Sequence, residues 1–175
     1  MLDVVFKETA IIKKIDQIRV GAAAGPGQIS ARLLKETKNE IAKPLAILFK
    51  RSMETGIVPE QWKTANVSPI YKKGQKTTPL NYRPVSLTCI IGKIMEMIIK
   101  DAIVAFFRRH NIIRDSQHGF TKAKSTLTNL LEYIAQITER LDLGKPVDVL
   151  YADYSKAFDV VPHARLATQE FKYQC

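Results

Sequence analysis

The stretch from Val147 to Asp159 constrains the fold most, because an apolar run ends there at a carboxylate. β-Branched and aromatic residues alternate over 147–151, directly after a Gly-Lys-Pro break, and this pattern predicts a short buried strand over 147–152. Asp153 would then lie at the carboxyl end of the strand, where open α/β sheets bind ligands and where a carboxylate suits Mg²⁺. The alternative is that Asp153 only caps the turn or helix that follows, which is the commoner use of Asp at such a junction.

Charge is distributed unevenly along the chain. The 175 residues carry a formal net charge of +10, and residues 1–80 hold 14 lysines and arginines against 7 acidic residues. Residues 81–140 hold 9 against 5, whereas residues 141–175 hold 4 against 5. This asymmetry suits a body that binds a polyanion and an end that binds cations, although a coat of solvated lysines gives the same composition. A hydrophobic content of 46% is typical of a globular protein of one domain or parts of two.

Several classes of protein are disfavoured by the sequence. The two cysteines, Cys89 and Cys175, are far apart and form no CxxC pair, so we expect an intracellular, reducing location and no structural zinc site. Charged residues interrupt the apolar run over 90–107, which argues against a membrane span and against a membrane as partner. Charged residues also break up the N-terminus, which therefore does not read as a signal peptide.

Local patterns predict a helix-rich chain with one β-hairpin. In order, the expected elements are a helix within 5–18, a loop over 21–27, helical segments from Ser30 that restart or kink at Pro44 and end at Gly56, strands over 65–71 and 84–87 joined by a basic turn over 72–75, and helices over 90–107 and 125–141. The helix over 90–107 is apolar nearly all round and is expected to be buried, and Gly144 supplies a stop for the last helix. The lone strand over 147–152 needs a partner, which is either the hairpin or residues outside this sequence.

Eight blocks of residues occur in a recognisable order along almost the entire chain. They are Ala23-Ala24-Gly25-Pro26, Arg32-Leu33-Leu34-Lys35-Glu36, Gly56-Ile57-Val58-Pro59 with Trp62-Lys63, Pro69-Ile70-Tyr71-Lys72-Lys73-Gly74, Asn81-Tyr82-Arg83-Pro84-Val85-Ser86-Leu87-Thr88, Gly92-Lys93-Ile94-Met95-Glu96, Ser116-Gln117-His118-Gly119-Phe120 and Asp153-Tyr154-Ser155-Lys156-Ala157-Phe158-Asp159. In content and order they resemble the reverse transcriptase domain of non-LTR (LINE-type) retrotransposons. The resemblance implies an α+β fold with helix-rich fingers over 1–145 and the start of a palm, with its first strand, over 146–175. This would be an incomplete right-hand polymerase fold.

The resemblance also implies roles for individual residues around the chemistry. Asp153 matches the first metal-binding aspartate of the family, which bridges two Mg²⁺ ions in nucleotidyl transfer, and Tyr154 would offer its backbone carbonyl to the second ion. Phe158 matches the bulky position that packs against the incoming sugar and excludes a 2′-hydroxyl. Asp159 is expected to be a structural cap.

Basic and polar residues upstream match the positions that hold nucleotide and template. Lys72, Lys73 and Arg83 correspond to the hairpin that folds over the triphosphate, although a solvated turn is the simpler reading of these residues alone. A second set corresponds to the block along the template and nucleotide pocket: Gln117, Gly119, Phe120, Lys122 and Lys124. His118 is expected to pack or to form hydrogen bonds rather than to catalyse. The implied partners are an RNA template, a DNA primer and deoxynucleoside triphosphates.

The chain also departs from the family pattern. The family's second catalytic strand carries two adjacent aspartates, and no Asp-Asp dipeptide occurs in these 175 residues. Because a single carboxylate holds a hard divalent ion weakly, we expect Mg²⁺ binding to be weak or absent and the chain alone to be inactive as an RNA-directed DNA polymerase. Two alternatives stay open, namely a non-catalytic module that binds RNA or RNA–DNA hybrid, and the product of a decayed element copy. Active relatives would act in the nucleus. Smaller departures are Gly27-Gln28 after Gly25-Pro26, and Ala123 where a glycine is common.

Overall fold

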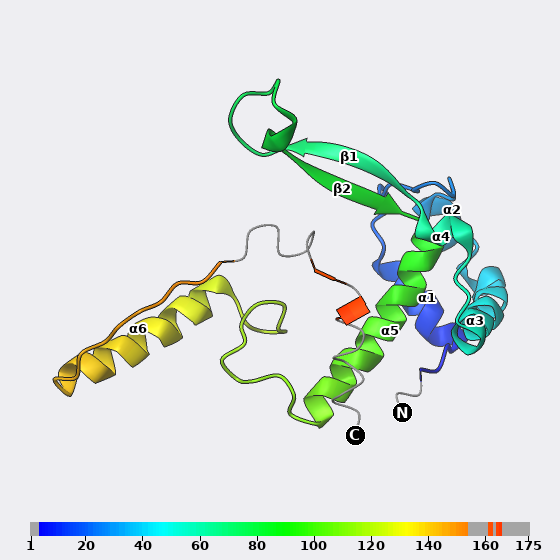
Figure 1. The fold of residues 1–175 in the computed structure, drawn as a ribbon. Coiled ribbons are helices and arrows are strands. Elements are labelled where there is room, and N and C mark those ends of the chain that lie inside the picture. Colours follow the sequence, from blue (N-terminus) through cyan, green and yellow to red (C-terminus); the bar gives the residue numbers. More distant parts are fainter. Residues whose placement is uncertain (1–3, 154–160, 163, 166–175) are drawn as a thin grey trace. The chain divides into compact units, whose positions relative to one another are not determined.

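The computed structural model describes residues 4–153, 161–162 and 164–165, and these fall into two compact units (Figure 1). The first unit covers residues 2–110 and contains five α-helices and the hairpin among its described residues, and the second covers residues 111–175 and contains one helix among its own. The mixture of helices with a two-stranded antiparallel sheet confirms the α+β class. The boundary between fingers and palm predicted at 145/146 is a different division from this one and stays a prediction.

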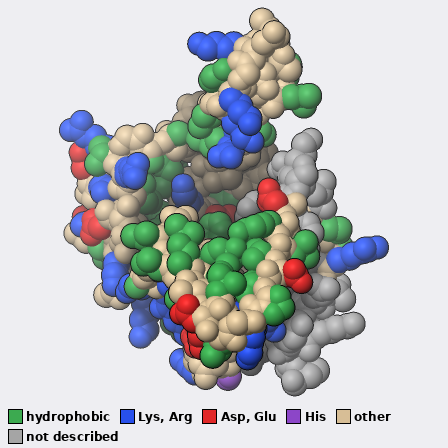
Figure 2. Space-filling model, turned by 90° about the vertical axis from the view of Figure 1, so that its left-hand side faces the viewer, with side chains coloured by type: hydrophobic (Ala, Val, Ile, Leu, Met, Phe, Trp, Pro, Cys, Tyr) green, Lys and Arg blue, Asp and Glu red, His purple; other side chains and the backbone are tan. Residues whose placement is uncertain are grey.

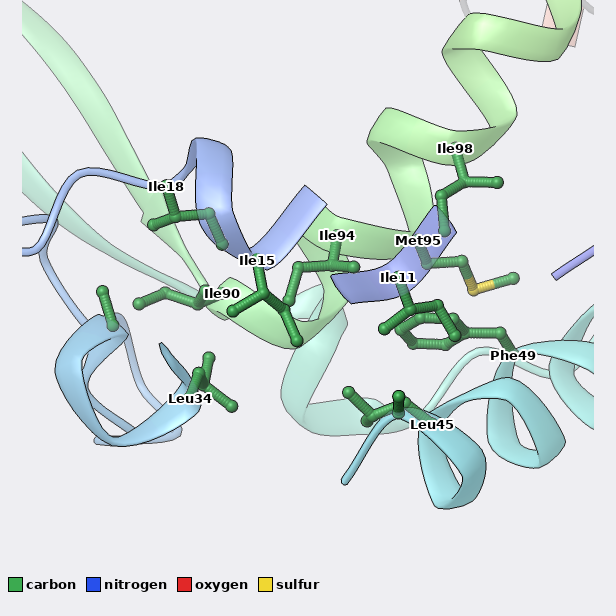
Figure 3. Close-up of a cluster of buried hydrophobic side chains, with 12 residues drawn as sticks. Ile11, Ile15, Ile18, Leu34, Leu45, Phe49, Ile90, Ile94, Met95 and Ile98 are labelled. Atoms are coloured by element: carbon green, nitrogen blue, oxygen red, sulfur yellow. The ribbon is translucent and has the colours of Figure 1, made fainter. Parts of the chain in front are cut away.

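The core of the first unit lies between helices α1 (Glu8–Gln17), α2 (Ala31–Glu36), α3 (Lys38–Thr55) and α5 (Ile90–Arg109). Ile11, Ile15 and Ile18 recur every three or four residues, so α1 points one apolar face into this core. Figure 3 shows how Ile11 and Ile15 of α1 meet Phe49 of α3 and Ile94 of α5. All four of these side chains are fully buried, and each contributes about 1.5–3 kcal/mol of stability by leaving water.

The helix predicted from Ser30 to Gly56 is divided at Thr37 rather than at Pro44. Ser30 caps α2 as predicted, since its hydroxyl accepts a hydrogen bond from the Leu33 N–H at 3.2 Å. The Thr37 hydroxyl donates to the Leu33 carbonyl at 2.9 Å, which satisfies one of the carbonyls freed where α2 ends. Pro44 lies inside α3 on its exposed side, where water can replace the N–H bond that proline removes. Gly56 ends α3 with φ of +67°, as predicted.

Strands β1 (Ala65–Tyr71) and β2 (Tyr82–Thr88) form the predicted hairpin, in register from Ala65 opposite Thr88 to Tyr71 opposite Tyr82. The connection covers 72–81 and includes a short 3₁₀ turn, η1 (Pro79–Asn81), so it is longer than the predicted turn over 72–75. An aromatic contact fixes the start of the hairpin to the core. Trp62, in helix α4 (Glu60–Lys63), packs edge-to-face on Phe49 of α3, with ring centroids 5.8 Å apart.

The other end of the hairpin is also fixed. Cys89 and Ile90 follow β2 directly and are buried. A Cβ added to Gly92 would meet Trp62 at 3.2 Å, so this glycine lets α5 and α4 approach closely. Both strands therefore leave a packed base, and the hairpin is an arm projecting from it (Figure 1).

In the second unit, helix α6 (Thr126–Asp142) confirms the helix predicted over 125–141. A reciprocal pair of hydrogen bonds between Ser125 and Thr128 caps its first turn. Its last turn is closed by hydrogen bonds from the N–H groups of Gly144 and Lys145 to the carbonyls of Leu141 and Arg140. The apolar stripe of α6 faces solvent in this structure, and its exposed members are Leu127, Leu130, Leu131 and Ile134.

The buried strand predicted over 147–152 is not formed. This segment has no strand partner among the described residues, because β1 and β2 pair only with each other. An unpaired strand cannot satisfy its backbone groups within a sheet, so the chain instead runs in irregular form alongside α6 (Figure 1). Leu150 is 92% exposed and Tyr151 is 79% exposed. Tyr133 and Tyr151 hold the segment to α6 through a hydrogen bond of 2.6 Å between their hydroxyls and through their rings, whose centroids lie 6.3 Å apart.

Within the described ranges, no helix combines the length and the apolar character needed to cross a membrane.

Candidate nucleic-acid interface

The hairpin places two of the predicted nucleotide-binding residues on one face. Arg83 lies opposite Ile70 in the register, and Lys72 follows Ile70 by two residues, so Lys72 and Arg83 share the face of Ile70. The Lys72 N–H donates to the Asn81 carbonyl at 2.8 Å, which continues the pairing up to Lys72. Lys73 is the next residue of the connection, and the side chains of Lys72, Lys73 and Arg83 are all exposed. Figure 2 shows basic side chains standing on the projecting hairpin.

No acidic residue occurs between Glu60 and Glu96, a stretch that contains the whole hairpin. The positive charges of the arm are therefore not neutralised by carboxylates of their own segment. In water such exposed cations are hydrated and mobile, and a phosphate chain can exchange with their counterions. The arm can thus bind a polyanion without base-specific contacts.

The second group of predicted residues lies in the loop before α6. His118 is its buried anchor: its Nδ1 donates to the Ser116 carbonyl at 3.1 Å, and its Nε2 lies 3.3 Å from Oε2 of Glu132 on α6. The prediction that His118 packs and forms hydrogen bonds is therefore confirmed. The Gln117 amide donates to the Gly119 carbonyl at 3.0 Å, which turns the chain back on itself.

Around this anchor, Phe120 is fully exposed with φ of +59°, and Lys122 is exposed while Lys124 is half-buried. An aromatic ring that stands free beside two ammonium groups has the composition of a surface that stacks a base and meets phosphate. Ala123 has φ of +66°, a backbone conformation that strains an L-residue and that glycine adopts without strain. The roles of Gln117, Gly119, Phe120, Lys122 and Lys124 in template binding stay predictions.

Asp153 is exposed and is the last described residue before 154–160. Tyr154, Phe158 and Asp159 lie outside the described residues. Nowhere in the described part of the chain do three or more His, Cys, Asp or Glu side chains gather where they could hold a metal ion. A single exposed carboxylate does not amount to the donor set of a two-ion site. The metal-binding role of Asp153 therefore stays a prediction.

Two residues before Asp153, Tyr151 shares a hydrogen bond with Tyr133 of α6 that changes the pKa of Tyr133. The hydrogen bond with Tyr151 raises the pKa of Tyr133 above its ordinary value, because it stabilises the protonated phenol, and desolvation and the charge of Tyr151 act in the same direction. The Tyr133 phenol is therefore protonated at neutral pH and can take part in this hydrogen bond.

Three further side chains, Tyr71, Asn81 and Tyr82, brace the hairpin loop through hydrogen bonds to its backbone. Their types and their position, at the two ends of a lysine-rich connection, are visible in the sequence. Their bracing role cannot be seen in the sequence, because it depends on which backbone carbonyls the folded loop places next to their side chains.

Comparison with known proteins identifies the family. Residues 70–175, well over half of the chain, match the reverse transcriptase (RNA-dependent DNA polymerase) family. The chain therefore belongs to the reverse transcriptase family, and the resemblance to non-LTR retrotransposon enzymes predicted from the sequence is confirmed by its relatives. The matched region includes the last two residues of β1, all of β2, the loop of His118, and Asp153.

The curated relatives are polymerases of mobile elements. The chain is 25% identical over 160 residues to a probable RNA-directed DNA polymerase from transposon BS of Drosophila melanogaster, covering 91% of this chain and 18% of the relative. It is 30% identical over 145 residues to that of the X-element of the same species, covering 82% and 16%. A polyprotein of the type-1 retrotransposable element R2 of Popillia japonica is 28% identical over 111 residues, covering 63% and 15%. The chain thus spans less than a fifth of the length of the relatives it matches.

Proposed function

We propose that this chain supplies the fingers and the beginning of the palm of a non-LTR retrotransposon RNA-directed DNA polymerase. The observation that carries this proposal is the basic arm, in which Lys72 and Arg83 share one face of a hairpin whose base is packed into the helical core. Such an arm suits the phosphates of an incoming deoxynucleoside triphosphate, above an RNA template paired with a DNA primer. The enzyme would act inside the cell, in the nucleus.

Chemistry in this family needs divalent metal, which stabilises the charge on the transferring phosphoryl group. Of the proposed ligands, the 175 residues contribute the carboxylate of Asp153 and the backbone carbonyl of Tyr154, and they contain no adjacent pair of aspartates. Phe158 would exclude the 2′-hydroxyl of a ribonucleotide. We therefore expect residues 1–175 by themselves to bind nucleic acid without extending a primer.

The polymerase assignment can be tested with a chimera. Residues 1–175 replace the matching segment of the transposon BS polymerase, and incorporation is measured on an RNA template with a DNA primer and Mg²⁺. We expect incorporation that falls at least a hundredfold with Asp153→Asn, because loss of a bridging carboxylate removes charge from both metal positions. Asp148→Asn is the matched control, since Asp148 is also exposed and lies five residues earlier. Equal incorporation with and without Asp153→Asn would contradict the metal-binding role.

A second candidate function is a basic module that binds RNA or RNA–DNA hybrid without chemistry. It is favoured by the exposed charges of the arm, which no carboxylate between Glu60 and Glu96 neutralises. A chimera that binds the primer–template and stays folded, yet never incorporates nucleotide, would favour this second function over the first.

A further inference from the structure

The loop over 72–81 is exposed but not loose. Three consecutive carbonyls in it accept hydrogen bonds from the side chains of Tyr71, Asn81 and Tyr82, which lie where the loop meets the two strands. Tyr71 Oη donates to the Gly74 carbonyl at 2.5 Å, and Asn81 Nδ2 donates to the Gln75 carbonyl at 2.8 Å. Tyr82 Oη donates to the Lys76 carbonyl at 2.8 Å. The path of the loop from Gly74 to Lys76 is therefore fixed by the last residue of β1, the first residue of β2 and Asn81 of η1.

Ring packing supports the same brace. Tyr71 and Tyr82 lie opposite each other in the register, with ring centroids 5.7 Å apart in an edge-to-face arrangement. Lys76 places its ammonium 5.6 Å from the centroid of the Tyr71 ring. Gly74 has φ of +92°, and a Cβ there would come within 2.6 Å of Asn81 Nδ2, so the loop passes as close to Asn81 as a glycine allows.

The brace has a consequence for the electrostatics of the loop. Its carbonyls at 74–76 are occupied, whereas the backbone N–H groups of 73–77 have no hydrogen-bond partner among the described residues. Lys72, Lys73 and Lys76 add three positive charges, and the loop contains no carboxylate. Successive unpaired amides with ammonium groups form a surface that suits a polyphosphate.

We infer that Tyr71, Asn81 and Tyr82 are positioning residues, which hold this loop in the conformation that receives the phosphates of a nucleoside triphosphate. The inference rests on the proposed function for the identity of the ligand, but the brace itself rests on the hydrogen bonds. Without the three side-chain hydrogen bonds, the ten-residue loop would be ordered only when phosphate binds. The entropy cost of ordering would then be subtracted from the binding free energy, and the affinity for phosphate would fall.

The test uses the complete 175-residue chain and sodium tripolyphosphate as the probe, with affinity measured by calorimetry. Tyr71→Phe and Tyr82→Phe keep the rings and remove only the donated hydrogen bonds, and each should weaken binding by about fivefold, as expected for one hydrogen bond. Tyr133→Phe is the matched control, because it removes a bonded hydroxyl from the other unit, and it should leave the affinity unchanged.

A second readout separates positioning from direct contact. The backbone order parameters of residues 74–76, measured by ¹⁵N relaxation without ligand, should fall in Tyr71→Phe and Tyr82→Phe but not in Lys72→Ala, which should weaken binding only. Wild-type affinity in both tyrosine variants, unchanged order in them, or no tripolyphosphate binding by the wild type would each overturn the inference. Failure of the chimera to incorporate nucleotide, with tripolyphosphate binding intact, would overturn the polymerase assignment and leave the brace in place.

Discussion

Gly25 and Gly56 have the same backbone conformation in very different surroundings. Both have φ of +67°, which an L-residue adopts only with strain. A Cβ on Gly25 would lie 2.4 Å from the carbonyl oxygen of Thr88, at the end of β2, whereas a Cβ on Gly56 would meet nothing within 4 Å. Gly25 thus lets the loop before α2 press against the base of the hairpin.

We predict different costs for the two alanine substitutions. Gly56→Ala should lower the free energy of unfolding by about 1–2 kcal/mol, from backbone strain alone. Gly25→Ala should lower it by about 3 kcal/mol or more, because the backbone of Thr88 must also move. Urea denaturation followed by circular dichroism measures both. Equal costs would show that the loop does not pack on Thr88 as described.

At this scale the sequence predicts what is decided within a few residues. Ser30 as a cap and Gly56 and Gly144 as helix ends are confirmed, because each depends on hydrogen bonds or backbone angles within a few residues. The hydrogen bonding of His118 is confirmed as well, and its local part is the bond to the Ser116 carbonyl. The strain at Ala123 and the brace by Tyr71 depend instead on the path of a whole loop, which no local pattern specifies.

Among the elements, the hairpin carries a proline at the same level in each strand. Pro69 lies opposite Pro84. Because the Lys72 N–H bonds directly to the Asn81 carbonyl, and bonded and non-bonded pairs alternate in an antiparallel ladder, the Pro69 and Pro84 nitrogens point to the outer edges of the hairpin. Each exposed edge thus lacks one donor at its centre, which hinders pairing with a further strand.

Replacing both prolines should therefore promote self-association. In Pro69→Val with Pro84→Val, each outer edge gains an N–H, and we expect sedimentation velocity at tens of micromolar to show dimers or larger species. Ser86→Val is the control, since it adds an exposed valine to the same face without a new N–H, and it should remain like the wild type. A doubly substituted chain that stays monomeric would contradict this role for the prolines.

Prediction of the elements succeeded where their stabilising contacts are local or contained in the chain. Helix α6 has its own cap and stop, and β1 and β2 supply each other's partners. The strand predicted over 147–152 failed because alternation of apolar residues indicates a strand only when a neighbouring strand exists, and the described residues provide none. The helix break or restart predicted at Pro44 was wrong because Pro44 lies on the exposed side of α3, where water can replace the lost hydrogen bond.

For the whole molecule, the uneven distribution of charge is consistent with membership of a family of RNA-dependent DNA polymerases, since these act on nucleic acid. The positive excess lies in residues 1–140, and the hairpin presents part of it free of carboxylates. Composition alone left open a coat of solvated lysines. An interface and a coat of solvated lysines differ in whether the position of a charge matters. At an interface, removing two charges from the binding surface should weaken binding more than removing two charges from elsewhere on the protein.

The most direct measurement of this claim is the affinity of the 175-residue chain for an RNA–DNA hybrid as a function of salt. We expect affinity to fall steeply as salt rises, and Lys72→Ala with Arg83→Ala to lower the slope of log affinity against log salt by about 2. The matched control is Lys43→Ala with Arg51→Ala, which removes the same charge from exposed positions of α3. It should leave the slope near that of the wild type. Equal losses in the two variants, or binding that does not depend on salt, would contradict the assignment of the hairpin as the nucleic-acid-binding arm.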